Sequence, residues 1–200
     1  MQNWDSYRRK TGLVIVLSGP SGVGKDCVLE EFVNIQPDVN RCVTVTTRAP
    51  RPGEESGKDY HFVSVEEFRR MDEEGEFLEF AEVHGNLYGT PRRWVEGQTA
   101  AGRDVVLKID VQGGIAVKRQ VPDAVMVFLS PPSIEELEKR LRSRLTESEA
   151  EVTKRLLDAR SELAHILSYE YMIENDVVKE AASRLRAIVI AERSRIIHPR

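Results

Sequence analysis

The chain has 200 residues, which suits one domain or one core carrying small inserted lobes. Hydrophobic residues make up 40% of it and charged residues 31%, as in an ordinary soluble protein. The formal net charge of −4 argues against a general nucleic-acid-binding protein. No stretch approaches the roughly 20 apolar residues of a membrane span. Cys27 and Cys42 form neither a metal-ligand spacing nor a disulfide framework. We therefore expect a cytoplasmic protein that binds neither membranes nor nucleic acid.

A buried strand and a glycine-rich loop form the most informative segment. Residues 13–17 are apolar, and three of them are β-branched, as expected of a buried parallel strand. The next residues fit the spacing G-x-x-x-x-G-K, in which glycines turn backbone N–H groups inward and a lysine begins a helix. Such a loop holds the phosphates of a nucleotide. Its residues are Gly19, Pro20, Ser21, Gly22, Val23, Gly24 and Lys25.

Short strands and turns follow the first helix. We expect that helix over residues 27–33 and a short strand over 41–46. Two prolines and a glycine in 49–53 end the strand. A strand over 60–63 precedes a helix that Ser64 and Glu67 begin as a capping box, and Gly85 and Asn86 indicate a turn. The short strands and turns of residues 44–104 therefore predict a small lobe that differs from the first 40 residues.

The second half of the chain returns to buried strands and longer helices. Strands are predicted over 104–110 and 125–129, and Pro131 ends the second. Ser133 and Glu136 form another capping box, and residues 146–149 indicate a further helix start. A short strand over 171–173 and a helix from about 180 to about 195 complete the chain.

Strands that alternate with helices predict an α/β protein, with a parallel sheet flanked by helices on both faces. In such sheets, ligands bind beyond the carboxyl ends of the strands. Gly19, Asp110 and Asn175 each follow or end a predicted strand, so we expect them to converge.

Several motifs in order resemble the guanylate kinases, P-loop enzymes that transfer a phosphoryl group from ATP to GMP. The resemblance extends over about residues 12–195, and as a set the motifs are highly specific. They occupy residues 18–25, 46–54, 57–62, 77–81, 86–90, 109–113 and 140–144. The family's architecture implies a nucleotide-binding core (12–43, 104–134 and 166–195), a GMP-binding lobe (44–103) and a helical lid (135–165). Residues 1–11 and 196–200 are expected to be flexible ends.

The resemblance also implies the residues that bind GMP. Arg48 and Arg51 would supply forked donors to its phosphate, and Tyr60 and Tyr88 would add hydroxyl donors. Glu79 would accept from guanine N1–H and N2–H₂, which rejects adenine because adenine has an acceptor at N1. The remaining residues implied near the base are Thr44, Thr90 and Asp110. We expect dGMP to be accepted as well, because no residue is assigned to the ribose 2′-hydroxyl.

For ATP, the resemblance implies binding on the glycine-rich loop, with Asn175 near the adenine. Phosphoryl transfer needs charge neutralisation more than covalent chemistry. Lys25 and Mg²⁺ would supply it, together with Arg48 and the lid residues Arg140, Arg144 and Arg155. A solvated helix face is the other interpretation of Arg140 and Arg144.

The sequence departs from the family pattern at three positions. Asp26 replaces the usual Ser or Thr, and we expect it to hold Mg²⁺ directly or through water. Lys108 stands where the family commonly has an acidic residue, and it could pair with Asp110, bind a phosphate or face solvent. Leu145 replaces a glycine of the lid.

Two alternative functions remain open from the sequence. The loop ending Gly-Lys-Asp also occurs in ribose 1,5-bisphosphate kinases. Some guanylate-kinase-like domains are inactive and bind phosphorylated peptides, but their phosphate loop is typically degraded, whereas here Lys25 and the loop are intact. We therefore expect an ATP:GMP phosphotransferase of purine nucleotide metabolism.

Overall fold

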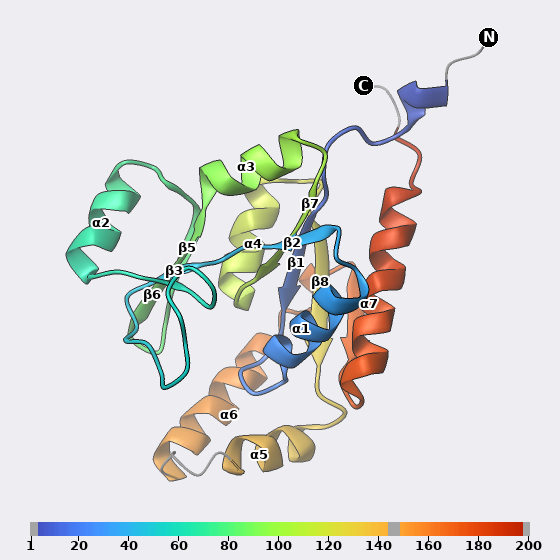
Figure 1. Cartoon of the computed structure of the whole chain (residues 1–200). Helices are drawn as coiled ribbons and strands as arrows, with labels where there is room; N and C mark the ends of the chain where they lie inside the picture. Colours follow the sequence, from blue (N-terminus) through green and yellow to red (C-terminus); the bar gives the residue numbers. More distant parts are fainter. Residues whose placement is uncertain (1–3, 144–148, 198–200) are drawn as a thin grey trace.

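A five-stranded parallel sheet forms the centre of the computed structural model, which describes residues 4–143 and 149–197 (Figure 1). The strand order is β2-β7-β1-β8-β9, and every pair of neighbours is parallel. The strands are β1 (Val14–Ser18), β2 (Val39–Arg41), β7 (Asp104–Lys108), β8 (Val125–Ser130) and β9 (Tyr171–Glu174). The predicted α/β fold is confirmed.

Helices cover both faces of this sheet because its strands are apolar on both sides. Along β1, Ile15 and Leu17 pack against α1 (Lys25–Ile35) and α7 (Val178–Arg193). Val14 and Val16 belong to the cluster on the opposite face, with side chains of α3 (Arg92–Ala100) and α4 (Val111–Gln120). Alternate residues of a strand point to opposite faces, so one apolar run supplies two cores. Figure 1 shows the two pairs of helices on either side of the sheet.

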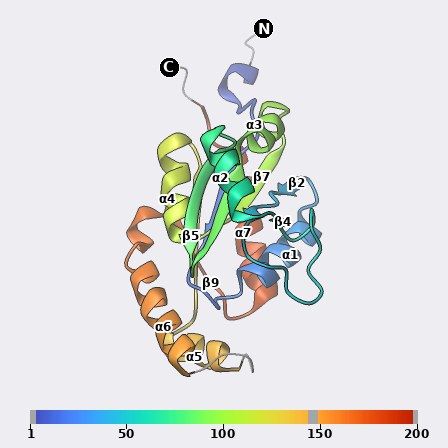
Figure 2. The ribbon, with the colours of Figure 1, turned by 90° about the vertical axis from the view of Figure 1, so that its left-hand side faces the viewer.

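A second, four-stranded sheet lies beside the first, and Figure 2 views the molecule from its side. Its order is β4-β3-β6-β5, with β6 antiparallel to both of its neighbours. The strands are β3 (Val45–Thr46), β4 (His61–Phe62), β5 (Phe77–Val83) and β6 (Asn86–Pro91), and α2 (Val65–Glu73) follows β4. This part has its own apolar cluster, in which the rings of Phe68 and Phe77 stack 4.5 Å apart.

The single strand predicted over residues 41–46 is wrong. The segment forms the end of β2 in the first sheet and all of β3 in the second. Between them, the backbone N–H of Cys42 donates to Val106 of β7, while the carbonyl of Thr44 accepts from His61 of β4. Because the chain changes hydrogen-bonding partners within two residues, one β-branched run crosses from sheet to sheet.

Two helices lie beyond the carboxyl ends of the parallel strands, α5 (Ile134–Arg142) and α6 (Glu149–Leu163) (Figures 1 and 2). They pack on each other through Leu137, Leu141, Val152 and Ala159. Ser133 caps α5 by accepting from the backbone N–H of Glu136 at 3.1 Å, as its sequence predicts. Arg144, Leu145 and the helix start at 146–148 lie outside the described residues.

Short 3₁₀ helices complete the fold at Trp4–Tyr7 and Ile166–Ser168. No helix in the described ranges combines the length and apolar character needed to cross a membrane.

Candidate nucleotide-binding cleft

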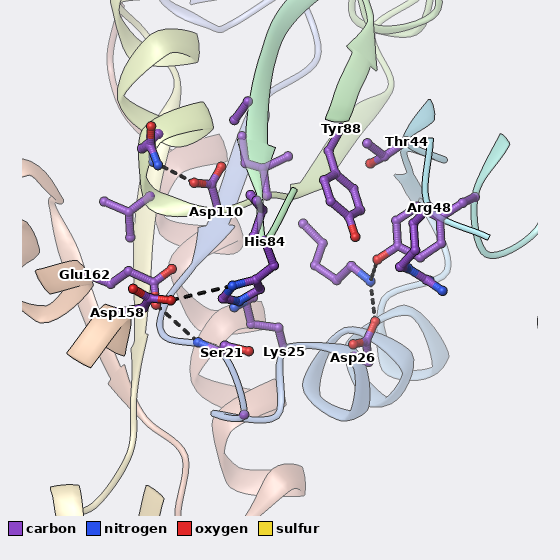
Figure 3. A pocket seen from close by; sticks show the side chains of 18 of the residues that line it. Ser21, Lys25, Asp26, Thr44, Arg48, His84, Tyr88, Asp110, Asp158 and Glu162 are labelled. Carbon is purple, nitrogen blue, oxygen red and sulfur yellow. Dashed lines mark hydrogen bonds and ion pairs between the residues drawn. The ribbon is translucent and has the colours of Figure 1, made fainter. Parts of the chain in front are cut away.

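A cleft of about 790 Å³ opens where the glycine-rich loop, the second sheet and α6 meet (Figure 3). Thirteen of the residues predicted for the site line it, although they come from seven separate segments of the chain. They are Ser21, Gly22, Gly24, Lys25, Asp26, Thr44, Arg48, Arg51, Tyr60, Glu79, Tyr88, Asp110 and Arg155. The structure therefore places the predicted donor and acceptor residues around one space.

The other described site residues lie behind this lining. They are Gly19, Pro20, Val23, Thr90, Arg140 and Asn175. Asn175, expected near adenine, is buried, and its side-chain N–H₂ donates to the carbonyl of Val23 at 2.7 Å. Arg140 donates to the carbonyl of Asn175 at 3.0 Å and to that of Val23 at 3.5 Å. Both side chains therefore brace the backbone of the glycine-rich loop in this structure.

Glycine is required in the loop for steric reasons. Gly24 has φ +96°, and a Cβ there would lie 2.6 Å from the Asn175 side-chain nitrogen. A Cβ on Gly19 would lie 2.1 Å from the carbonyl oxygen of Leu129. The loop consequently lies directly on the end of β8 and on the residue that follows β9.

Two charged side chains meet the phosphate loop from inside the cleft. Lys25 donates to the carbonyls of Gly19 and Pro20, and burial lowers the pKa of its ammonium below the ordinary value. Glu162 of α6 accepts from the backbone N–H of Ser21 at 3.2 Å, and burial raises the pKa of Glu162 (Figure 3). A loop amide that donates to a carboxylate can equally donate to a phosphate oxygen.

Arg155 reaches the same loop from α6. Its guanidinium donates to the Ser21 hydroxyl at 2.6 Å. Helix α6 is therefore joined to the phosphate loop at two places, by Arg155 and by Glu162 about two turns further along the helix.

The second sheet contributes a cluster of arginine and tyrosine side chains. Arg48 forms a two-pronged ion pair with Glu54 at 2.8 and 3.0 Å, which raises the pKa of Arg48. Its guanidinium carbon lies 5.3 Å from the centre of the Tyr60 ring, and Tyr60 meets Tyr88 edge-on at 5.9 Å. Glu54 also accepts from the backbone N–H of Arg51 at 2.7 Å, so one carboxylate fixes the loop that carries both arginines.

A buried carboxylate lies on β5 in the same cleft. Glu79 accepts from the Thr90 hydroxyl at 2.5 Å, and burial raises the pKa of Glu79 to about 7. Asp110 adds a nearby negative charge while it caps α4, accepting from the backbone N–H groups of Gln112 and Gly113. In its ionised form, this carboxylate can accept two N–H donors from a ligand, and its shifted pKa is typical of a functional site.

Lys108 takes a partner that the sequence did not indicate. The ammonium forms an ion pair with Asp26, neither pairing with Asp110 nor facing solvent, and binding of a phosphate stays a prediction. It also donates to the Tyr60 hydroxyl at 3.1 Å. Burial is the largest single influence on Lys108 and disfavours its charge, but Asp26 and Tyr60 together raise the pKa of the ammonium above its ordinary value.

Four further residues in or beside the cleft are not predicted from the sequence as site residues. A Cβ on Gly113 would lie 2.6 Å from a carboxylate oxygen of Glu79, so this glycine gives Glu79 its space. His84, at the tip of the β5–β6 hairpin, lies 3.5 Å from Asp158 of α6 (Figure 3). Gly113 belongs to the motif at residues 109–113, so its importance could be inferred from the sequence, whereas Glu162, His84 and Asp158 have no distinctive local pattern.

The donor set for a metal ion is small. No cluster of three or more His, Cys, Asp or Glu side chains suited to a metal occurs among the described residues. Asp26 presents a carboxylate where α1 meets the phosphate loop. One carboxylate together with substrate phosphates is a usual environment for Mg²⁺, so the residues present fit this ion.

Comparisons with known proteins agree with this arrangement. The family model described as guanylate kinase matches residues 11–192. The chain is 46% identical to the guanylate kinase of Caldanaerobacter subterraneus subsp. tengcongensis, covering 94% of this chain and 91% of the relative. It is 48% identical to that of Aromatoleum aromaticum, covering 92% and 90% respectively. The crystal structure of guanylate kinase from Anaplasma phagocytophilum superposes with a TM-score of 0.79 at 36% identity, covering 93% of this chain and 88% of that one.

Proposed function

We propose that the two walls of the cleft hold the two substrates of this protein. The chain belongs to the guanylate kinase family and is therefore an ATP:GMP phosphotransferase. The glycine-rich loop would hold ATP, and the second sheet would hold GMP. The observation that carries this assignment is the single cleft that Lys25, Arg48 and Glu79 line together.

On the donor side, the backbone N–H groups of the loop and Lys25 would bind the ATP phosphates. Arg155 already contacts Ser21 of this loop, so its guanidinium is placed to stabilise the charge that develops on the γ-phosphoryl group. Arg140 and Asn175 would act by holding the loop backbone. Arg144 remains a family-based proposal.

On the acceptor side, Arg48 and Arg51 would hold the GMP phosphate with Tyr60 and Tyr88. Glu79 would accept from N1–H and N2–H₂ of guanine, supported by the Thr90 hydroxyl. Thr44 and Asp110 border the same space. Adenine would leave the Glu79 carboxylate facing a lone pair, which explains discrimination by large factors.

Mg²⁺ would be held by Asp26, directly or through water, together with the ATP phosphates. When bound, the ion neutralises phosphate charge during transfer. The acceptor oxygen of the GMP phosphate is already nucleophilic, so none of the protein side chains has to act as a strong base.

We further propose that residues 44–103 and 135–165 close over the core as a lobe and a lid, which would exclude water and limit ATP hydrolysis. The reaction would serve purine nucleotide metabolism in the cytoplasm. Both GMP and dGMP would be substrates.

An assay of ADP release tests this function. With ATP and Mg²⁺, the protein should turn over GMP and dGMP, and AMP should be a much poorer acceptor. Glu79→Gln should lose most of the preference for GMP over AMP, because an amide presents one donor and one acceptor. Turnover of ribose 1,5-bisphosphate in place of GMP would overturn the proposed acceptor.

A further inference from the structure

Lys108 connects the two walls of the cleft. It is the last residue of β7, and its side chain is only 9% exposed. Its ammonium pairs with Asp26 in the first turn of α1 and donates to the Tyr60 hydroxyl, beside β4. The ammonium also lies 5.0 Å from the centre of the Tyr60 ring. One cation therefore contacts both the phosphate loop and the predicted acceptor wall.

The contact with Asp26 changes the charge at the phosphate loop. A carboxylate at this position adds a negative charge next to bound phosphates, which on its own weakens their binding. The Lys108 ammonium forms an ion pair with the Asp26 carboxylate, so it offsets the added charge of Asp26.

The contact with Tyr60 fixes the direction in which that hydroxyl donates. A tyrosine oxygen that accepts an N–H must direct its own proton to a different acceptor. Tyr60 lines the cleft next to Arg48, so an anion bound by Arg48 is the acceptor within reach. A hydroxyl that accepts from an ammonium is also a stronger donor, because linked hydrogen bonds polarise one another.

We propose that Lys108 is a positioning residue, held by Asp26, which orients the Tyr60 hydroxyl toward the phosphate of the nucleoside monophosphate and neutralises Asp26 beside the nucleoside triphosphate. The proposal rests on the assignment of GMP to the second sheet. It assigns to two departures from the family pattern, Asp26 and Lys108, one shared task.

Lys108→Met is the central variant, because it keeps the length and removes the charge. It should raise KM for GMP and KM for ATP by about tenfold each, the effect of losing a hydrogen bond to a charged group. Calorimetric titration of GMP and of ADP, without turnover, should show the same two losses. A KM for both substrates within about twofold of the parent overturns the proposal.

Two double variants separate the two contacts. If Lys108 neutralises Asp26, Asp26→Asn in the Lys108→Met background should recover most of the ADP affinity measured by calorimetry without Mg²⁺, where Asp26 has no metal to hold. If Lys108 acts on GMP through Tyr60, Lys108→Met should change KM for GMP by less than about twofold in a Tyr60→Phe background. Effects that simply multiply in both backgrounds overturn the proposal.

The controls address folding and the assigned function. Lys118→Met removes a lysine that pairs with Glu170 away from the cleft, and it should leave both KM values unchanged. Thermal unfolding reports the integrity of each variant. If Lys108→Met alone does not fold, the comparison of Asp26→Asn/Lys108→Met with Asp26→Asn measures the effect on GMP without an uncompensated Asp26. A parent protein that does not phosphorylate GMP contradicts the proposed function instead, whereas an active parent with independent effects contradicts only the role of Lys108.

Discussion

Folding and ligand binding place opposite demands on the charge of Glu79. The folded pKa of about 7 lies above the ordinary value of 4.5, because burial disfavours the carboxylate. The unfolded chain therefore loses this proton at lower pH than the folded protein. The free energy of unfolding should fall as pH rises from about 4.5 to about 7, by a contribution on the order of 3 kcal/mol.

Guanine should reverse this preference, because its two N–H groups donate only to the ionised form of Glu79. We expect the Kd for GMP to rise up to about tenfold per pH unit as pH falls below 7. Calorimetry between pH 5.5 and 8 measures this dependence. The phosphate of GMP also titrates near pH 6, so Glu79→Gln is the reference, since it retains the phosphate titration alone. Identical pH profiles for the parent and Glu79→Gln would contradict the role of Glu79.

Gly113 provides a second test of the same site. In Gly113→Ala, the new methyl group meets Glu79 and the Asp110 side chain, and it should push Glu79 out of place. We expect KM for GMP to rise about tenfold or more, since about 1.4 kcal/mol of lost binding gives that factor, with KM for ATP unchanged. Gly97→Ala is the matched control, because a Cβ on this helical glycine meets no atom within 4 Å. Equal kinetics for the two variants would show that Glu79 does not need this space.

At the scale of elements, the second sheet depends on a small core of its own. Phe68 of α2 is buried against Phe77 of β5 and Val45 of β3, apart from the clusters of the five-stranded sheet. Loss of this contact should therefore affect GMP binding before ATP binding.

Phe68→Ala should cost about 3–5 kcal/mol of stability, as large truncations in a core do. Hydrogen exchange should locate the loss in residues 45–91, and calorimetry should show weaker GMP binding with nearly unchanged ADP binding. Val65→Ala, at an exposed position of the same helix, provides the control. Protection lost equally throughout the five-stranded sheet would show that the two cores unfold together.

The elements that local sequence defines were predictable. Apolar runs identified β1, β7, β8 and β9 of the central sheet, and Ser133 and Glu136 marked the start of α5. The division of residues 41–46 between two sheets was not predictable, because β-branched residues typical of a strand occur in both halves of the segment. Only long-range pairing, with β7 on one side and with β4 and β6 on the other, distinguishes them.

The candidate site shows the same limit. Glycine positions follow from the backbone of one loop, so they could be predicted from the sequence. The pairing of Lys108 with Asp26 joins residues 82 positions apart, and that of Glu162 with Ser21 joins residues 141 apart. Neither contact leaves a local pattern, since charged side chains at those positions resemble an ordinary solvated surface.

For the whole molecule, the two substrate walls belong to different parts of the chain, and α6 connects them. Arg155 contacts the phosphate loop, while Asp158 lies near His84 at the tip of the second sheet. If residues 135–165 close over the core as proposed, α6 would bring an arginine to the triphosphate and contact the second sheet at the same time. Arginine is suited to this position because its planar guanidinium binds phosphoryl oxygens in a forked geometry.

Arg155→Ala tests whether α6 delivers charge to the reaction. We expect kcat to fall by about 10³-fold, the scale of removing an arginine that stabilises a phosphoryl-transfer transition state. The Kd for GMP should stay within about twofold, because the acceptor wall is built from other residues. Arg160→Ala, at an exposed position of the same helix, should retain kcat. If Arg155→Ala raises only KM for ATP and leaves kcat unchanged, Arg155 binds the ground state and the transition state equally, and α6 serves to hold ATP instead of to accelerate transfer.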